Sequence, residues 1–354
     1  MRVRALCFAS LLMMGLAGLV PPLRAQEMHA EYRDVDQIAE EFARIPHFDG
    51  RSSYTVNIRG FIDDIAVMDL EVNEVGDLPP LIVMVGGSEG GWWGRSTGFS
   101  PAGYLGQVLV DMGFSIRNLN HFGTDELADS WGEDLRPERL YERDLEPFAR
   151  VLADARQTLG ARNRCVGFIG ISKGGELALL LAAYEAELNA SETPLFDGVV
   201  ASVPSHVVWQ SPHRTMRVQS SWALGGEALD FVSYPWLSFH TPSVLLRRSS
   251  LAAFSEQALQ NDAAVQNALI PVERIETPTL LQGALEDHLW PSAAMAEAAW
   301  NRAEALNPDH AVELRQYSTG HNVYSTPEAI ADAALFMDEA LRLAHSEGRC
   351  EASF

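Results

Sequence analysis

Ser172 lies at the centre of a Gly-Ile-Ser-Lys-Gly pentapeptide at residues 170–174. An apolar run at 165–171 precedes the serine, and a segment rich in Leu and Ala at 176–183 follows it. A sharp strand-to-helix turn of this kind pushes one hydroxyl out of the backbone surface, and glycines on both sides avoid collisions there. The positive end of the helix dipole then points to where negative charge develops in acyl transfer. The pattern predicts a nucleophilic serine; a tight turn without chemistry is the alternative.

A serine hydroxyl is a weak nucleophile, so it needs a base that a third group orients. His321 is the candidate base among the ten histidines, because it follows a predicted strand and comes after the acidic loop in the chain. Two neighbouring carboxylates in that loop compete to orient the base, Glu286 and Asp287. The sequence favours Asp287, which lies four residues before Pro291, and leaves Glu286 open.

A glycine-rich loop, Gly-Gly-Ser-Glu-Gly-Gly at 86–91, follows another apolar run. Such loops can bind phosphates, but this one lacks the G-K-[ST] of a P-loop and the glycine spacing of a dinucleotide-binding motif. We therefore interpret it as the loop that supplies the second oxyanion donor. The candidate oxyanion donors are the backbone N–H groups of Gly87, Ser88, Glu89 and Lys173. Lys173 is the only lysine, and its side chain is not expected to act as the base because adjacent side chains on a tight turn diverge. No metal-ligand spacing is evident, and neither metal nor cofactor is expected.

The elements that must position these residues alternate between strands and helices. Strands are predicted at 54–58, 65–72, 81–85, 114–119, 165–171, 198–203, 279–281 and 312–317. Helices are predicted at 34–45, 102–112, 140–159, 176–183, 292–306 and 327–344. This alternation predicts a mostly parallel central sheet with helices on both faces, and the serine turn makes it an α/β-hydrolase fold.

One interval, residues 205–262, interrupts the alternation after the sixth strand. It contains seven aromatic residues and equal numbers of acidic and basic ones. Loops of this length are usually functional or disordered, and the aromatic content argues against disorder. We therefore predict a lid over the site; a packing subdomain without substrate contact is the alternative. The candidate substrate contacts are Trp209, Trp222, Tyr234, Trp236 and, from the loop after the fourth strand, His121.

The N-terminus combines a basic start, an apolar run at 5–20 and a small residue at Ala25. This pattern is typical of a secretory signal peptide at residues 1–25, so we expect a secreted or periplasmic protein without a stable membrane span after cleavage. An uncleaved anchor is the alternative. The remaining residues, 26–354, are expected to form a single domain that includes the lid.

The net charge of −22 disfavours nucleic acid and anionic membranes as partners. It would become −25 after removal of the three arginines of the signal segment. Cys7 would also leave, so Cys165 and Cys350 would remain. In an oxidising compartment they permit one disulfide, and two inert thiols remain an equal alternative.

With these residues assembled, the chain resembles the C-terminal catalytic domain of the acyl-CoA thioesterase and bile-acid-CoA:amino-acid N-acyltransferase family. The resemblance rests on segments in the family order at 86–91, 170–179, 204–210, 270–275, 287–292 and 320–321. It implies that Ser172 is the nucleophile, that His321 is the base and that Asp287 orients it. Members with cysteine as nucleophile transfer acyl groups to amines, whereas serine members mostly hydrolyse.

Three departures from the family pattern matter. The family's N-terminal β-sandwich has no room between Gln26 and Pro80, and an extra residue in the acid loop keeps Glu286 in contention. The signal peptide would also direct the protein to where acyl-CoA is scarce. Four lid arginines could meet CoA phosphates, but ion pairs with the acidic body are favoured. They are Arg214, Arg217, Arg247 and Arg248.

The sequence therefore predicts a serine hydrolase for a small-molecule acyl ester or thioester, with CoA not expected as the native leaving group. Three alternatives stay open. The same residues would serve an acyltransferase or an amidase or peptidase, and a catalytically inactive binding protein could use the same scaffold.

Overall fold

The computed structural model describes residues 54–72, 78–88, 90, 104–123, 135–157, 163–189, 191, 193–212, 218–235 and 251–354. Several predictions fall outside these residues: the signal peptide, the helix at 34–45, Glu89, Trp236 and the four lid arginines. Within the described ranges, no helix is both long enough and apolar enough to cross a membrane.

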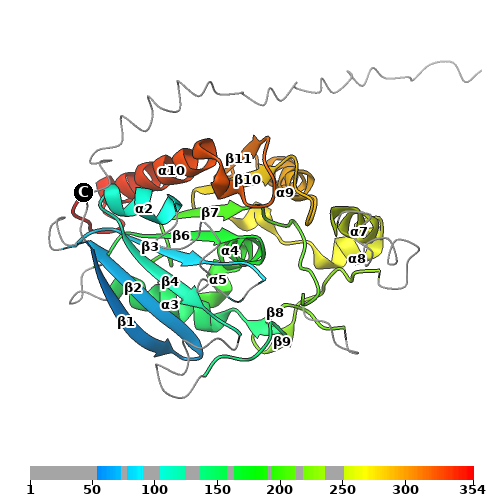
Figure 1. The fold of residues 1–354 in the computed structure, drawn as a ribbon, viewed down its shortest axis with the longest axis horizontal. Coiled ribbons are helices and arrows are strands. Elements are labelled where there is room, and N and C mark those ends of the chain that lie inside the picture. The colour runs from blue at the N-terminus through cyan, green and yellow to red at the C-terminus, as the bar shows by residue number, and fades with distance from the viewer. Residues whose placement is uncertain are drawn as a thin grey trace, which may run out of the picture. The chain divides into compact units, whose positions relative to one another are not determined.

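An eight-stranded sheet lies at the centre of the fold (Figure 1). Its spatial order is β1 (Tyr54–Ile62), β2 (Ile65–Val72), β4 (Ser115–Asn120), β3 (Leu81–Val85), β6 (Val166–Ile171), β7 (Gly198–Ser202), β10 (Thr279–Ala284) and β11 (Val312–Tyr317). The pairs β1–β2 and β2–β4 are antiparallel, and the five pairs from β4 to β11 are parallel. This order and pairing confirm the α/β-hydrolase fold.

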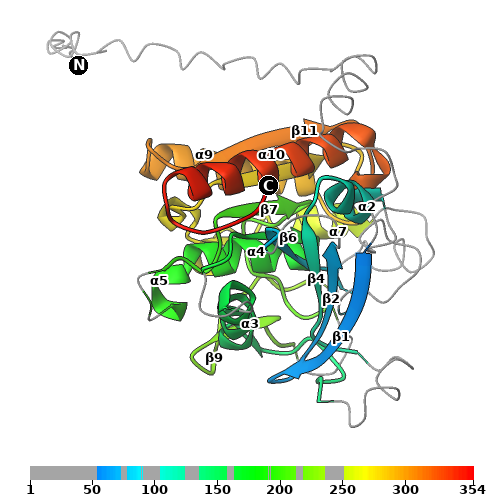
Figure 2. The same ribbon diagram turned by 90° about the vertical axis from the view of Figure 1, so that its left-hand side faces the viewer.

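Helices cover both faces of the sheet, because parallel neighbours require crossover connections. On one face α2 (Tyr104–Asp111) and α10 (Pro327–Ser346) share a core with alternate sheet residues, among them Met84. On the other face α3 (Glu146–Gln157), α4 (Lys173–Ala183) and α9 (Ser292–Leu306) pack with the intervening residues, among them Val85. The two layers can be followed in Figures 1 and 2. Short helices are α5 (Glu185–Leu188), η2 (Val272–Arg274) and η3 (Val323–Ser325).

The interval between β7 and β10 is a long insertion, at the predicted place. Its described parts contain β8 (Trp222–Leu224), β9 (Glu227–Ala228), α7 (Leu251–Ala258) and α8 (Asp262–Ala268). The strands β8 and β9 form a small sheet with β5 (Arg143–Asp144), which comes from the body of the domain. Part of the insertion is therefore a fixed extension of the fold, and its role as a lid stays a prediction.

The predicted helix at 140–159 is wrong in its first turns. The N–H groups of Arg143 and Leu145 donate to the carbonyls of Ser221 and Ala223, so this stretch joins the small sheet. Helix α3 begins only at Glu146. Pairing with a segment about 80 residues further along the chain thus overrides the local helical period.

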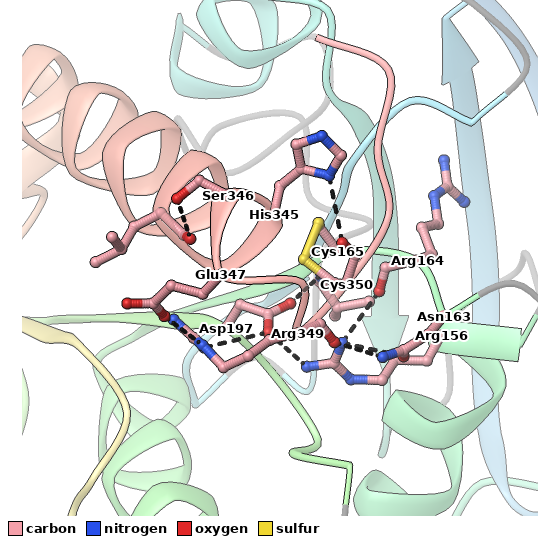
Figure 3. Close-up of a disulfide and its surroundings, with 12 residues drawn as sticks. Arg156, Asn163, Arg164, Cys165, Asp197, His345, Ser346, Glu347, Arg349 and Cys350 are labelled. Atoms are coloured by element: carbon pink, nitrogen blue, oxygen red, sulfur yellow. Dashed lines mark hydrogen bonds and ion pairs between the residues drawn. A yellow bond between two sulfur atoms is a disulfide. The ribbon is translucent and has the colours of Figure 1, made fainter.

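A disulfide joins Cys165 to Cys350, which settles the choice that the sequence left open (Figure 3). Around it, Cys165 N–H donates to the carbonyl of Glu351 at 3.0 Å, and Glu351 N–H donates to Asn163 at 2.7 Å. The bond therefore fastens the C-terminal tail to the start of β6, the strand that leads to Ser172. Cys165, Cys350 and Asp197 are also grouped as metal ligands would be, but sulfurs in a disulfide are not thiolates.

We predict that Cys165→Ser/Cys350→Ser lowers the free energy of unfolding by about 3–5 kcal/mol, because the bond closes a long loop in the unfolded chain. The two cysteines are 185 positions apart. Urea unfolding followed by far-UV circular dichroism measures the change, and wild type unfolded with a reductant is the control. A variant as stable as the oxidised wild type would contradict this role of the disulfide.

Candidate active site

Ser172 occupies the turn between β6 and α4 with φ 58° and ψ −116°, a backbone conformation that non-glycine residues rarely adopt. The turn is held from both sides: Ser172 N–H donates to the Ser202 carbonyl at 2.9 Å, and Glu176 N–H donates to the Ser172 carbonyl at 3.0 Å. A Cβ on Gly174 would collide with the backbone carbonyls of Val85 and Gly86. The helix therefore lies too close to β3 for any other residue at that position.

Ser172, His321 and Asp287 form a continuous hydrogen-bonded chain. The Ser172 Oγ lies 3.0 Å from His321 Nε2, and His321 Nδ1 lies 2.8 Å from Asp287 Oδ2. The His321 side chain is 21% exposed, whereas that of Asp287 has no exposed surface. Three residues predicted from separate segments thus meet where β6, β10 and β11 end. This is the arrangement in which an imidazole can take a proton from a serine hydroxyl.

The Asp287 carboxylate accepts three further hydrogen bonds besides the one from His321. Ser292 Oγ donates to Oδ2 at 2.6 Å, and the N–H groups of Leu289 and Trp290 donate to Oδ1 at 2.9 and 3.3 Å. Burial by itself would raise the pKa of Asp287. The hydrogen bond and charge of His321, with the other donors, outweigh burial and lower that pKa below its usual range. Asp287 is therefore ionised at neutral pH.

Glu286, the competing acid, is exposed, whereas Asp287 is buried. The N–H of Glu286 donates to the Thr319 carbonyl at 3.0 Å, which fixes the loop so that the next side chain, Asp287, points inward. The geometry favours Asp287 over Glu286.

A buried polar network lies behind the turn that holds His321. Ser202 Oγ donates to Gln282 Oε1 at 2.8 Å and is also hydrogen-bonded to the hydroxyl of Tyr324, three residues after His321. Gln282 Nε2 donates to the Tyr317 hydroxyl at 3.1 Å. Because the Ser202 carbonyl also accepts a hydrogen bond from the N–H of Ser172, this network connects the turn of Ser172 to the turn that follows His321. The sequence analysis missed it, although Ser202 and Gln282 are polar residues within otherwise apolar strands.

The candidate oxyanion donors lie beside Ser172. Gly87, Ser88 and Lys173 line the same cavity as the serine, and Glu89 is outside the described residues. Lys173 is the first residue of α4, so its N–H has no acceptor within the helix and points outward at the positive end of the helix dipole. This group can therefore donate to an anion formed at the serine.

The cavity has a volume of about 480 Å³. Besides Ser172, His321 and the oxyanion side, its lining includes a largely apolar wall formed by Tyr234, Leu251, Leu289 and Trp290. Leu251 and Leu289 are 45% and 48% exposed, and as lining residues of the cavity they would be covered by an apolar ligand bound there. The sequence analysis named Tyr234 but missed Trp290, although Trp290 follows directly after the acid loop.

The prediction that Trp209, Trp222 and His121 contact the substrate is wrong. All three residues are 0% exposed and belong to the core. His121 stacks on Trp222 with 5.7 Å between ring centroids, and it also packs against Phe122 and Phe148. Burial lowers the pKa of His121 well below its usual value, with nearby arginines adding to the effect, so this ring is neutral. The aromatic count of the insertion could not distinguish residues beneath its surface from those at the cavity.

The sequence model of one family, described as "BAAT / Acyl-CoA thioester hydrolase C terminal", matches residues 156–338, just over half of the chain. The chain belongs to this family. The matched range includes Ser172, Asp287 and His321, so the whole hydrogen-bonded chain of the site falls within the family region.

Among individual relatives, rat "Acyl-coenzyme A thioesterase 2, mitochondrial" is 24% identical over 220 residues, which are 62% of this chain and 42% of the relative. Human "Acyl-coenzyme A thioesterase 1" is 24% identical over 251 residues, 71% of this chain and 50% of the relative. This family member thus spans about half the length of the curated relatives it matches. Among solved structures, the acylaminoacyl peptidase of Pyrococcus horikoshii is 17% identical, with a TM-score of 0.47, over 86% of this chain and 43% of that one.

We predict that Asp287→Asn lowers kcat by about 10⁴-fold, because an amide cannot hold the imidazole in the tautomer that accepts the serine proton. The measurement is steady-state hydrolysis of a p-nitrophenyl ester. Glu286→Gln is the matched control, and as a change to an exposed side chain it should leave kcat within about twofold. The reverse ranking of the two variants would assign the acid to Glu286.

Proposed function

We propose that the protein is a serine hydrolase that cleaves a small-molecule ester or thioester with an apolar acyl group. The single observation that supports this most is the hydrogen-bonded chain from Asp287 through His321 to Ser172, which ends in a cavity with an apolar wall. Membership of a family described by thioester hydrolysis supports the same chemistry.

In the proposed reaction, Ser172 Oγ attacks the acyl carbonyl while His321 Nε2 takes the hydroxyl proton. The resulting oxyanion accepts hydrogen bonds from the N–H of Lys173 and from the loop at Gly87 and Ser88; one such donor is typically worth about 3 kcal/mol. His321 then passes the proton to the departing alkoxide or thiolate, which leaves an acyl-serine. A water molecule, deprotonated by the same imidazole, attacks the acyl-serine, releases the acid and regenerates Ser172.

The acyl group is proposed to occupy the wall formed by Tyr234, Leu251, Leu289 and Trp290. Trp290 also packs edge-on against His321, with ring centroids 6.1 Å apart, so the wall begins directly beside the base. Burial of apolar surface is non-directional and proportional to area. The wall therefore suits an acyl chain and offers few polar groups to an amide or peptide substrate, which makes peptidase activity the weaker alternative.

We further propose that the protein acts in an oxidising compartment outside the cytoplasm, as the N-terminal signal pattern predicts. The disulfide between Cys165 and Cys350 supports this location, since such bonds persist mainly in oxidising environments. Acyl transfer to an amine remains the alternative for the second step. Ser172 in place of cysteine favours water as the acceptor.

We predict that Ser172→Ala lowers kcat by on the order of 10⁵–10⁶-fold, because no acyl-enzyme can form without the hydroxyl. The purified protein should also lose labelling by a serine-directed fluorophosphonate, measured by intact mass. Ser325→Ala, which removes an exposed hydroxyl next to the His321 turn, is the control and should label normally. Appreciable ester turnover by Ser172→Ala would refute the proposed nucleophile.

For the leaving group, we predict that an acyl-CoA is hydrolysed no faster, by kcat/KM, than the N-acetylcysteamine thioester of the same acyl chain. The two substrates share the thioester, but only CoA brings several negative charges towards a chain with a net charge of −22. Stopped absorbance assays at low and high salt make the comparison. A large preference for CoA that disappears at high salt would show a cationic site for its phosphates and restore CoA as the natural carrier.

A further inference from the structure

The only lysine of the chain forms a buried ion pair directly behind the active site. Lys173 is 2% exposed and Glu176 is 0% exposed. The Lys173 Nζ lies 3.0 and 2.9 Å from the two carboxylate oxygens of Glu176. Burial raises the pKa of Glu176 and lowers that of Lys173, and in each case the opposite charge of the partner counters the effect. Charges this deeply buried are costly unless they are paired and their remaining hydrogen-bonding capacity is satisfied, and the further hydrogen bonds of this pair all go to the insertion.

Both members of the pair hold the backbone of one residue of the insertion, Trp209. The N–H of Trp209 donates to Glu176 Oε1 at 3.1 Å, and the carbonyl of Trp209 accepts from Lys173 Nζ at 3.4 Å. Glu176 Oε1 also accepts from the Trp222 indole N–H at 2.8 Å. The pair therefore ties two separate segments of the insertion, at Trp209 and at Trp222, to the first turn of α4.

Trp209 in turn lies behind both aromatic residues of the cavity wall. Its ring stacks on Tyr234 with centroids 4.9 Å apart and an interplanar angle of 18°. It also lies 6.5 Å from the ring of Trp290. A displacement of the Trp209 backbone would therefore move the surface that faces an acyl chain, while Ser172, His321 and Asp287 have hydrogen bonds of their own.

We propose that Lys173 and Glu176 are positioning residues that set the acyl-chain specificity of the site by holding Trp209, and through it the Tyr234–Trp290 wall. This inference rests on the proposed function only in taking the cavity as an acyl site. The two side chains act through Trp209 and do not touch the reacting atoms, whereas the proposed oxyanion contact of Lys173 is made by its backbone N–H. Its effect depends on chain length, since an acetyl group ends near Ser172 whereas an octanoyl chain must lie along the wall.

The test is the double variant Lys173→Met/Glu176→Gln, which removes both charges at similar side-chain volume, so no unpaired buried charge remains. The assay compares p-nitrophenyl acetate with p-nitrophenyl octanoate, with rates per active site titrated by fluorophosphonate. The readout is the ratio of the octanoate to the acetate value of kcat/KM, because Lys173 also offers its backbone N–H to the proposed oxyanion and a disturbance there would lower both values alike. We expect this ratio to fall about tenfold, the range that small misfits in an apolar pocket produce. Equal loss with both esters, or no change with either, would overturn the proposal.

A matched control removes another buried ion pair, between helix α3 and the residue before β7. Arg156 and Asp197 are 3.0 Å apart at the opposite end of β6, and Arg156→Met/Asp197→Asn should leave the ratio of octanoate to acetate rates unchanged. If this control shifted the ratio as much, the effect would be one of general stability and the proposal would be wrong.

A binding measurement separates this inference from the proposed function. In a Ser172→Ala background, octanamide binding is measured by calorimetry with and without Lys173→Met/Glu176→Gln. We expect the dissociation constant to rise about tenfold. An unchanged constant would refute the positioning role. A wild-type protein inactive on both esters would refute the hydrolase proposal instead, and the binding comparison would still decide this inference.

Discussion

The close approach of helix α4 to the sheet is the constraint on which the site depends. Gly174 lies against the carbonyls of Val85 and Gly86, and a Cβ at Gly170 would collide with the Gly174 carbonyl. Only with side chains absent from these positions can the chain turn from β6 into α4 within one residue. Ser172 is that residue, and its strained backbone, of a kind that costs about 1–3 kcal/mol, is held by hydrogen bonds to β7 and α4. The same approach brings Gly86, where the candidate oxyanion loop begins, beside the first turn of the helix.

Sheet topology then determines which loops can reach the serine. The strands β6, β7, β10 and β11 are consecutive neighbours and all run parallel, so their carboxyl ends meet at one edge. Asp287 follows β10 and His321 follows β11, which places the proposed acid and the proposed base in order along that edge. Two residues that are 149 positions apart, Ser172 and His321, thereby come within hydrogen-bonding distance. Function at this edge is the general behaviour of open α/β sheets.

The features that the sequence predicted are those with a local pattern. The strands at 81–85 and 312–317 and the helix at 292–306 agree with the structure to the residue, because apolar runs and amphipathic periods are read from neighbours. Ser172, His321 and Asp287 were chosen from the residues of the turn and from their order along the chain, and both can be read from the sequence alone. The start of the predicted helix at 140–159 failed because its partner strand lies far along the chain.

The insertion was harder to predict for a related reason. Trp209 and Tyr234 are both aromatic residues of the insertion. Trp209 is fully buried, however, whereas Tyr234 lines the cavity. The backbone N–H of Trp209, unlike that of Tyr234, is hydrogen-bonded to the buried carboxylate of Glu176, which holds Trp209 in the interior. A glutamate within the Leu- and Ala-rich segment after the serine gives no sign of its distant partners. Burial of an aromatic residue depends on what packs around it, and that is a property of the folded chain.

The same buried pair also decides how the site can stabilise negative charge. Lys173 is adjacent to the nucleophile, but its ammonium group is turned inward and neutralised by Glu176 at 2.9 Å. In the proposed reaction, an oxyanion at Ser172 would therefore meet the backbone N–H of Lys173 and the end of α4, not the lysine charge. Fixed dipoles of this kind need no reorganisation as charge develops, whereas a flexible ammonium group would have to be desolvated. The backbone N–H at the start of α4 therefore faces the serine, while the side chain of Lys173 is bonded to Glu176 and to the carbonyl of Trp209 in the insertion.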